Sequence, residues 1–579
     1  MYVLGINLSH DRAACLVKDG RVVVAVEEER LDRFKHSEGF IIHGHFEKLS
    51  KVLPMKSITY CLDAEGIGLD DVDIVVGNRP LSDGAEDRIL RELPIRDKSK
   101  IHSLPMPSHH LSHAYAGYLA SPFEDAAVLV VDGVGSKVPG TGRIEKHTIF
   151  DGEGTGLRAV HAETFPEDWS EVGLGLFYSF FSAKLGFVTR WGHPTFGDFG
   201  CGGYTEAGKT MGLAPYGRPR PEWGTLLTVK GGNVSARVED LERAWESWLA
   251  SDGDGYDASA KDSWTSQFAK DVAYKIQQET EEAMLQLARH AYEVTGRSKL
   301  CLTGGVALNS VANQRIAAEG PFDEVYILPP AGDAGNAIGA AYYGYYAVGG
   351  GTERHTLRSG STGRTYTAQE IEQAVQEVGD RLESRTATVA EVAGLLAEHR
   401  LIGWFQGGSE IGPRALGHRS MLADPRHPDS RDYLNQVVKH REVFRPFAPS
   451  VLHEEAAQWF DMRGGDSPFM LLVPDVLEQR RETVPAITHV DGTARVQTVE
   501  ADVNARYHEL ISRFGELTGV PLVLNTSYND AGEPIVETPQ DAVRTFLNTE
   551  LDHLYIGDLL LTKPGRELPD RHPSRRPLA

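Results

Sequence analysis

Alternating apolar and polar positions at the start of the chain predict a β-hairpin followed by a third strand. Residues 1–33, MYVLGINLSHDRAACLVKDGRVVVAVEEERLDR, contain three apolar runs, separated by a polar loop at residues 9–11 and a turn at residues 19–20. A similar pattern restarts at residues 126–137, AAVLVVDGVGSK, where an apolar strand ends at Asp132. The two openings indicate two related halves.

Such a duplication, in which each half begins with a strand hairpin, resembles the ASKHA superfamily of actin, sugar kinases and heat-shock chaperone ATPases. A later segment, KLCLTGGVALNSVANQRIA, predicts a strand, a turn at Gly304 and Gly305, and a helix, which suits close approach of a nucleotide. Another, ILPPAGDAGNAIGAAYYGYYA, places Asp333 in a glycine-rich turn before a helix. We predict an ASKHA-type domain over residues 1–348.

The next stretch, residues 349–365, predicts a linker. Its sequence, GGGTERHTLRSGSTGRT, is rich in glycine and polar residues and has little apolar periodicity. Residues 366–579 then alternate amphipathic helices such as TAQEIEQAVQEVG with short apolar strands such as RLIGWFQG and HLYIGDLLLT. The predicted fold class is therefore α/β, with a duplicated ASKHA (actin-like ATPase) domain followed by a second α/β domain.

Composition narrows the function classes. The 579 residues, 41% apolar and 24% charged, describe a globular protein of at least two domains. Apolar runs fall short of the ~20 residues of a membrane span, so we expect a cytoplasmic protein without a membrane partner. Four widely spaced cysteines argue against a disulfide framework, and a net charge of −23 argues against nucleic acid as a partner.

A pair of histidines in PSHHLSHAYAGYLASPF predicts part of a metal site. His109 and His113 are four positions apart, so they fall on one face of the helix that follows. Asp132 and Asp333 end up near them if an ASKHA fold brings the strand-end loops together. Two imidazoles and two carboxylates suit Fe²⁺, Mn²⁺ or Zn²⁺. Asp132 also has the ordinary alternative of stabilising its own turn.

His10, at the end of the first strand, is a candidate general base. A loop histidine at the mouth of this cleft can accept a hydroxyl proton because its pKa lies near working pH. A buried, hydrogen-bonded histidine is the ordinary alternative.

Basic side chains beyond the linker predict an anion site. They lie beside glycine, proline and phenylalanine, where a charge needs a partner, and arginine forks suit phosphate oxygens. The residues are Arg414, His418, Arg419 and Arg426 in IGPRALGHRSMLADPR, Lys439, Arg441 and Arg445 in VVKHREVFRPFAPSV, Arg495 in HVDGTARVQTV, and Asn525, Thr526, Ser527 and Asn529 in LNTSYND.

Many motifs together resemble the O-carbamoyltransferases of the NodU/CmcH family, in the same order along nearly the whole chain. They are INLSHDRAACLV, EEERLDRFKH, HHLSHA, VVDGVG, KTMGLAPYG, TGGVALN, GDAGNAIGAA, GPRALGHRS, VKHREVFRPFAPSV, DGTARVQTV and LNTSYN. The chain departs from some relatives in the sequence HDRAA, where Arg12 is expected to narrow or charge the acceptor entrance.

The resemblance implies two sites with different tasks. A YrdC-like C-terminal domain would make carbamoyl adenylate from carbamoyl phosphate and ATP with Mg²⁺, and the ASKHA domain would transfer the carbamoyl group beside an iron ion. It implies the metal ligands His109, His113, Asp132 and Asp333, the base His10, and the adenylation residues Arg414, Lys439, Arg445, Arg495, Asn525 and Ser527, of which Lys439 and Arg445 are catalytic. Further candidates for nucleotide contact in the ASKHA domain are Lys35, Gly304, Gly305 and Asn309.

The expected acceptor is a hydroxyl of a small molecule, such as the sugar of an antibiotic or another natural product, and the expected assembly is a homodimer. Two alternatives stay open. An ASKHA kinase of a small molecule would explain the glycine-rich turns but leaves the C-terminal basic residues unused. A non-catalytic nucleotide-binding partner protein should bind tRNA, which the net charge disfavours.

Overall fold

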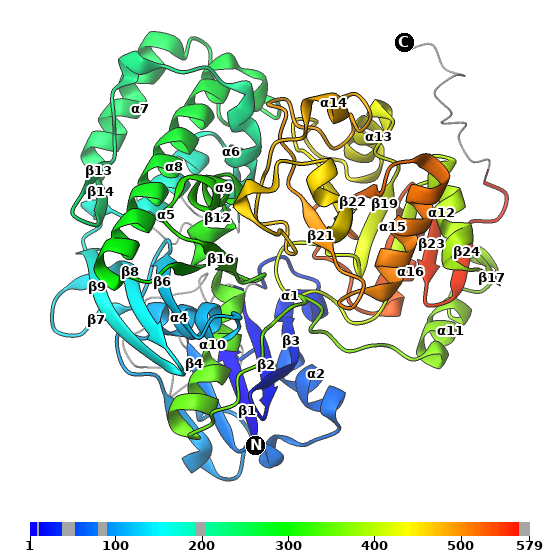
Figure 1. Cartoon of the computed structure of the whole chain (residues 1–579), viewed down its shortest axis with the longest axis horizontal. Coiled ribbons are helices and arrows are strands. Elements are labelled where there is room, and N and C mark those ends of the chain that lie inside the picture. Colours follow the sequence, from blue (N-terminus) through cyan, green and yellow to red (C-terminus); the bar gives the residue numbers. More distant parts are fainter. Residues whose placement is uncertain (9–10, 38–52, 79–89, 191–202, 567–579) are drawn as a thin grey trace. The chain divides into compact units, whose positions relative to one another are not determined.

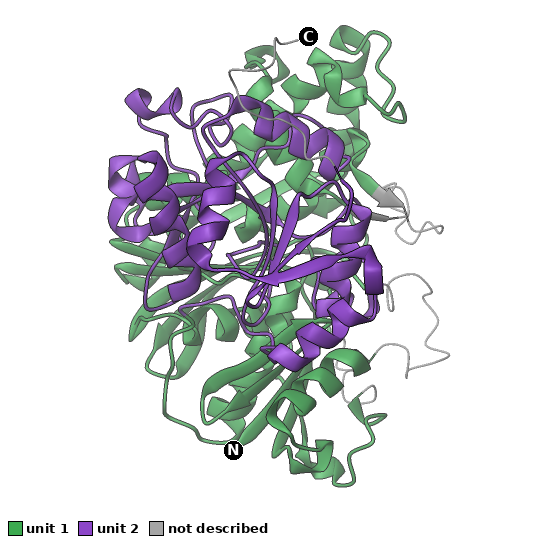
Figure 2. Cartoon of the chain, turned by 90° about the vertical axis from the view of Figure 1, so that its right-hand side faces the viewer, with its two compact units in different colours: residues 1–28, 36–357 green, residues 29–35, 358–579 purple. Residues whose placement is uncertain are grey.

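The computed structural model forms two compact units, which Figure 2 distinguishes by colour. It describes residues 1–8, 11–37, 53–78, 90–190 and 203–566. Unit 1 comprises residues 1–28 and 36–357, and unit 2 comprises residues 29–35 and 358–579. The second boundary lies inside the predicted linker. Both units mix helices and strands, so the predicted α/β class is confirmed at that level.

Unit 1 contains one sheet in the order β3-β2-β1-β4-β5. The first three strands form antiparallel pairs, whereas β4 and β5 run parallel to β1. The bounds are β1 Tyr2–Asn7, β2 Ala13–Lys18, β3 Arg21–Glu27, β4 Ile74–Asn78 and β5 Ile101–Ser103.

A second sheet of unit 1 repeats this topology in the order β9-β8-β6-β15-β16, and the short β7 also pairs with β8. The pairs among β6, β8 and β9 are antiparallel, and β15 and β16 continue in parallel. The bounds are β6 Asp125–Val131, β7 Lys137–Val138, β8 Arg143–Glu153, β9 Gly156–Pro166, β15 Lys299–Thr303 and β16 Glu324–Ile327. The same order and directions in both sheets agree with the expected duplication.

Two helices lie between these sheets and carry the candidate site. Helix α10 (Asn336–Tyr342) packs on β1, β2 and β4, and α4 (His109–Leu119) packs on β6 and β15 (Figure 1). The helices also pack on each other, where a Cβ at Gly339 would lie 1.9 Å from the carbonyl oxygen of Ser112. Coverage by a helix explains why β1 and β6 are nearly continuous apolar runs.

The remainder of unit 1 adds helices and short strands around this frame. They are α2 Met55–Glu65, β10 Glu171–Val172, α5 Leu174–Lys184, β11 Val188–Arg190, β12 Gly203–Thr205, α6 Ala207–Leu213, β13 Thr228–Lys230, β14 Asn233–Arg237, α7 Val238–Asp252, α8 Gln267–Thr295 and α9 Ser310–Glu319.

Unit 2 is built on a sheet in the order β17-β24-β23-β18-β19-β22-β20-β21. Its strands are β17 Glu383–Thr386, β18 Ile402–Phe405, β19 Arg419–Ala423, β20 Ala448–Leu452, β21 Gln497–Val499, β22 Leu522–Ser527, β23 His553–Ile556 and β24 Leu559–Thr562. The helices are α11 Ala368–Gln376, α12 Val389–Ala397, α13 Pro428–Tyr433, α14 Glu478–Arg481, α15 Ala505–Thr518 and α16 Pro539–Asn548. One apolar core joins sheet and helices, with Trp404 fully buried in it.

Two expectations from composition can be compared with the described residues. Cys15, Cys61 and Cys301 are buried free thiols, and Cys201 lies outside those residues. Within the described part of the chain, no helix is long and apolar enough to cross a membrane.

Candidate functional site

The four predicted metal ligands converge in unit 1. The Nε2 atom of His109 lies 3.0 Å from Asp132 Oδ2 and 3.4 Å from Asp333 Oδ1. The Nε2 atom of His113 lies 3.5 Å from each of the same two oxygens. One ligand atom from each residue falls within 4.8 Å of the others, and all four residues are buried.

Three separate elements bring these ligands together. The histidines occupy the first two turns of α4, Asp132 directly follows β6, and Asp333 begins the turn that leads into α10. The backbone N–H of Gly305 donates to Asp132 Oδ1 at 2.9 Å. Its neighbour Gly304 has φ +94°, and a Cβ there would lie 2.3 Å from the carbonyl oxygen of Val131. The glycine pair therefore orients Asp132.

Asparagine side chains contact both imidazoles. Asn78 Oδ1 lies 2.9 Å from His109 Nδ1, so this ring nitrogen carries the hydrogen and Nε2 is left to face the carboxylates. A hydrogen bond of this kind, to the nitrogen that does not bind the ion, fixes the ring orientation of a metal-ligating histidine. Asn336 Nδ2, in contrast, lies 3.1 Å from His113 Nε2, the nitrogen that faces the carboxylates.

The ligands strongly perturb one another. Burial by itself lowers the pKa of His109, but attraction to Asp333 and the hydrogen bond with Asp132 outweigh it and raise the pKa to about 10. Burial raises the pKa of Asp132, yet hydrogen bonds from both histidines hold it well below its usual range. The pKa of Asp333 is also lowered, against burial, by His109. The imidazoles and the carboxylates therefore favour one another's charged forms.

The donor set fits a divalent first-row ion. Two imidazole nitrogens and two carboxylate oxygens match the preferences of Fe²⁺, Mn²⁺ and Zn²⁺, and the carboxylates balance the ion's charge. A histidine nitrogen must be deprotonated before it can bind the ion. Metal binding is therefore expected to release protons and to weaken as pH falls.

We predict that the purified protein binds about one first-row divalent ion per chain, and that Asp132→Asn or His113→Gln weakens binding at least ~10- to 100-fold. The measurement is elemental analysis followed by competition with a chromophoric chelator. His110→Gln is the matched control, because this buried histidine lies in the same helix but faces Thr148 Oγ1 at 2.8 Å. Equal metal content in Asp132→Asn and the wild type would contradict the assignment.

The candidate base, His10, lies outside the described residues, but its neighbours do not. Asp11 Oδ1 lies 2.9 Å from His36 Nδ1. Arg12 is 6% exposed and donates to Ser37 Oγ at 2.7 Å. Arg12 is thus buried within unit 1, and its expected role at an acceptor entrance stays a prediction.

The remaining candidates for nucleotide contact have other contacts in the structure. Asn309 begins α9, accepts a hydrogen bond from the Ala312 N–H at 3.1 Å and pairs with the amide of Gln277. Gly304 and Gly305 orient Asp132, as described above. Lys35 belongs to unit 2 and not to the N-terminal domain in which it was predicted. Nucleotide contact by these residues stays a prediction.

The predicted anion site of unit 2 includes Lys439, whose side chain is held by several hydrogen bonds. Its side chain, in a residue 4% exposed, donates to the carbonyl oxygens of Ser527 and Asn529 at 2.6 and 2.9 Å. It also contacts Ser527 Oγ at 3.2 Å and Asn529 Oδ1 at 2.7 Å. Asn525 precedes Ser527 by two residues on β22. Its side chain donates to the Ala415 carbonyl oxygen at 3.0 Å and so connects β22 to the loop that follows Arg414.

The cations of this site repel one another. Burial lowers the pKa of Arg414 to about 10, and the charge of Arg445 adds to this. The pKa of Arg495 falls through burial and then through Arg414, Arg441 and Arg445. The pKa of Lys439 falls through burial and then through Arg441, Arg445 and Lys35. The cations named here are therefore near neighbours in unit 2.

Few carboxylates compensate this charge. Arg445 forms an ion pair with Glu442 at 3.7 Å. Among the described residues, this is the one ion pair made by the group of cations that consists of Arg414, Lys439, Arg441, Arg445 and Arg495. The Nε atoms of Arg414 and Arg495 are buried without a hydrogen-bond partner in the described structure. Partly buried, uncompensated cations indicate an anion that completes the site.

Other basic residues of the same segments are structural. Arg419 is buried over the Phe405 ring at 3.6 Å and donates to the carbonyl oxygens of residues 406 and 407, each at 3.1 Å. Arg426 pairs with Asp424 at 2.6 Å. Burial lowers the pKa of His418, so this imidazole is neutral. The sequence could not separate these residues from Arg414, because all four share one short segment.

Family comparisons fit this pair of sites. The carbamoyltransferase N-terminus family matches residues 2–93 and 86–342, and the carbamoyltransferase C-terminus family matches residues 393–563. The chain therefore belongs to the carbamoyltransferase family, and it is a transferase enzyme.

Individual relatives narrow the class. The nodulation protein NolNO of Sinorhizobium fredii is 36% identical over 96% of this chain and 79% of its own. The 3'-hydroxymethylcephem-O-carbamoyltransferase of Amycolatopsis lactamdurans is 28% identical over 96% of this chain and 98% of its own. These relatives confirm the NodU/CmcH group of O-carbamoyltransferases that the motifs predicted.

Solved structures are more distant. HypF from T. kodakarensis shares 14% identity over 61% of this chain and 48% of its own, with a TM-score of 0.36. Component A of the (R)-2-hydroxyglutaryl-CoA dehydratase from Acidaminococcus fermentans shares 15% identity over 60% of this chain and 99% of its own, with a TM-score of 0.34. The family assignment rests on the sequence comparisons.

Proposed function

We propose that unit 2, as a YrdC-like domain, makes carbamoyl adenylate from carbamoyl phosphate and ATP, and that unit 1, as an ASKHA-type domain, transfers the carbamoyl group to a hydroxyl of a small molecule. The observation that carries the proposal is the group of poorly compensated cations in unit 2, in a chain of the carbamoyltransferase family. Carbamoyl phosphate and ATP are both anions and would occupy this site.

The first half-reaction needs charge stabilisation more than proton transfer. Carbamoyl phosphate and water give carbamate and phosphate, and a carbamate oxygen then attacks the α-phosphorus of ATP as pyrophosphate leaves. Lys439, Arg414, Arg445 and Arg495 would stabilise the developing negative charge, and Lys35 would add a further cation from the N-terminal segment of unit 2. Ser527 and Asn525 would orient the substrate by hydrogen bonding.

The second half-reaction would take place in unit 1. The acceptor oxygen attacks the carbamoyl carbon, AMP leaves, and His10 accepts the hydroxyl proton. An ion held by His109, His113, Asp132 and Asp333, which we propose to be Fe²⁺, supplies Lewis-acid polarisation of oxygen when bound. The name of the cephem relative supports a hydroxyl acceptor, and we propose a natural product such as an antibiotic.

Isotope exchange tests the first half-reaction directly. With ATP, carbamoyl phosphate and radiolabelled pyrophosphate, reversible adenylation should move label into ATP only when carbamoyl phosphate is present. A small-molecule kinase with an ASKHA fold, the main alternative, would show ADP formation with a sugar and no such exchange. Absence of carbamoyl phosphate-dependent exchange would rule out adenylation.

A further inference from the structure

A short segment from the N-terminal region is part of unit 2. Residues 29–35, here called the strap, follow β3 of unit 1 in sequence but group with residues 358–579 (Figure 2). The strap includes the end of the short helix α1 (Glu28–Asp32). Arg30, at 1% exposure, donates from Nη2 to the carbonyl oxygen of Gly412 at 2.6 Å, in the loop that carries Arg414. The strap therefore contacts the surroundings of the anion site.

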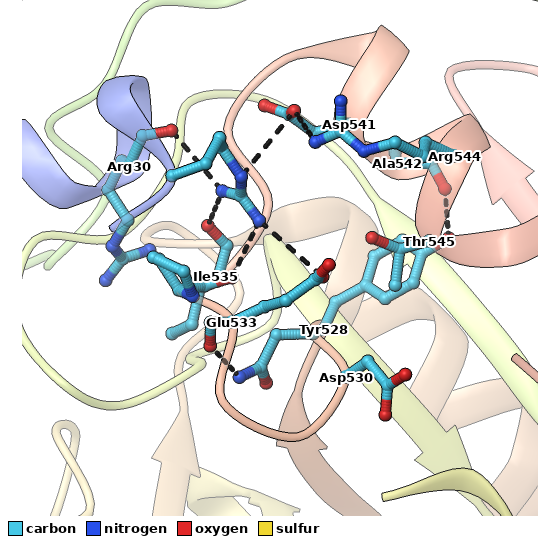
Figure 3. Close-up of polar contacts among 12 residues, drawn as sticks. Arg30, Tyr528, Asp530, Glu533, Ile535, Asp541, Ala542, Arg544 and Thr545 are labelled. Atoms are coloured by element: carbon cyan, nitrogen blue, oxygen red, sulfur yellow. Dashed lines mark hydrogen bonds and ion pairs between the residues drawn. The ribbon is translucent and has the colours of Figure 1, made fainter. Parts of the chain in front are cut away.

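Arg33, also in the strap, makes several contacts with a single loop of unit 2. Its Nη1 and Nη2 atoms donate to the carbonyl oxygens of Ile535 and Pro534 at 2.8 and 2.9 Å. Its guanidinium also lies 3.7 Å from Asp541 and 3.9 Å from Glu533, two residues that are labelled in Figure 3. The planar fork of arginine suits two successive carbonyl groups, and the two carboxylates balance its positive charge.

The backbone of Arg33 adopts an uncommon conformation. Its φ is +65°, in a region that residues other than glycine rarely occupy. Such a conformation persists where surrounding contacts fix it. The guanidinium provides those contacts through two ion pairs and through hydrogen bonds to the carbonyl oxygens of Arg30, Pro534 and Ile535.

Hydrogen bonds through Asn529 connect the loop that Arg33 contacts, residues 533–535, to Lys439. The carbonyl oxygen of Glu533 accepts a hydrogen bond from Asn529 Nδ2 at 2.6 Å. Asn529 Oδ1 in turn accepts from Lys439 Nζ at 2.7 Å and from Ser527 Oγ at 2.6 Å. A continuous series of contacts thus joins Arg33, residues 533–535, Asn529 and Lys439, all within unit 2.

We infer that Arg33 is a positioning residue for the anion site of unit 2. Arg33 fixes the loop at residues 533–535. This loop fixes the side chain of Asn529, and Asn529 in turn orients the ammonium group of Lys439 and the hydroxyl group of Ser527. Arg33 has no contact with Lys439 in the described structure and acts through the loop. The inference rests on the proposed adenylation in unit 2 and assigns a part in it to the N-terminal segment.

Pyrophosphate exchange in the full-length protein tests the inference. Arg33→Ala should lower the exchange rate at saturating substrates ~10- to 100-fold, because a small displacement of a catalytic group costs this much. The KM for ATP should stay within about twofold, because the Lys439 side chain is displaced and not removed. Arg33→Lys should also be impaired, since an ammonium group cannot present two parallel N–H groups to the carbonyls.

A double-mutant cycle separates positioning from a general loss of structure. If Arg33 acts through Asn529, the variant Arg33→Ala/Asn529→Ala should be no slower than Asn529→Ala alone. Arg544→Ala is the matched control: Arg544 pairs with the same Asp541 at 2.5 Å but is half exposed, and its loss should leave exchange unchanged.

Each outcome has a distinct meaning. Wild-type exchange in Arg33→Ala, or multiplicative losses in the double variant, would overturn the role of Arg33 while leaving adenylation in unit 2 intact. Should Arg33→Ala not fold, Arg33→Lys takes its place in the same cycle, and a full exchange rate in that variant would equally overturn the role. Absence of carbamoyl phosphate-dependent exchange in the wild type would instead refute the proposed function, and the inference with it.

Discussion

Replacing Lys439 by alanine is expected to lower carbamoyl phosphate-dependent pyrophosphate exchange roughly 100- to 1000-fold, the loss typical of removing one preorganised donor from developing charge. Lys439 is buried, and Arg441, Arg445 and Lys35 add to the burial that lowers its pKa. An anion placed among these charges would relieve their repulsion and keep the ammonium protonated. Alanine removes both this charge and the contacts to Ser527 and Asn529.

A second lysine of unit 2 provides the control for this experiment. Lys563 is also partly buried, lies 4.8 Å from the Phe546 ring and contacts the carbonyl oxygen of Thr549. Burial lowers the pKa of Lys563 to about 8, and burial likewise lowers the pKa of Lys439. Lys563 is not among the cations that shift the pKa of Lys439. Lys563→Ala should retain wild-type exchange. A Lys439→Ala variant that matches Lys563→Ala would show that adenylation takes place elsewhere.

Replacing His10 by asparagine is expected to leave pyrophosphate exchange intact and to lower transfer to the acceptor ~100- to 10,000-fold, the range of general base catalysis. Asparagine keeps approximate size and hydrogen bonding but cannot take up the hydroxyl proton. His10 belongs to the sequence of the N-terminal unit, whereas the proposed adenylation residues belong to unit 2, so the two activities should separate.

Preformed carbamoyl adenylate makes the separation sharper. Added to Lys439→Ala, it should restore carbamoylation of the acceptor, because that variant lacks only the first half-reaction. Added to His10→Asn, it should not, because the missing step is the transfer itself. The measurement is carbamoylated acceptor formed by each variant, and equal rescue of both would contradict the division of labour between the units.

Local patterns predicted much of the fold. Strands with period-two or continuous apolar sequence, broken by short polar turns, were sufficient to predict the first hairpin and its repetition after residue 126. The structure finds the same strand order and directions in both sheets of unit 1. The His109 and His113 pair was predictable for the same reason, since a spacing of four within a helix fixes which side chains share a face.

Other features depend on contacts between distant parts of the chain. Arg414, Arg419 and Arg426 occur within thirteen positions and look alike in sequence, yet Arg419 lies over Phe405 and Arg426 pairs with Asp424. Lys35 was predicted in the N-terminal domain because it follows the first strands, but it groups with unit 2. The sequence signal for this segment was the motif EEERLDRFKH. The motif did not indicate which of the two units the segment packs against.

The sequence by itself therefore determined the α/β class, the duplicated hairpins, the helix that carries the two histidines and the family of the enzyme, because each depends on neighbours in the chain or on motifs. The motifs also predicted His109, His113, Asp132 and Asp333 as one group, and the structure brings them together. Only the tertiary structure decided that residues 29–35 hold the loop beside Lys439. Arg33 and Ile535 are separated by 502 positions. No local periodicity encodes such a contact, because it forms only when packing of the core brings the segments together.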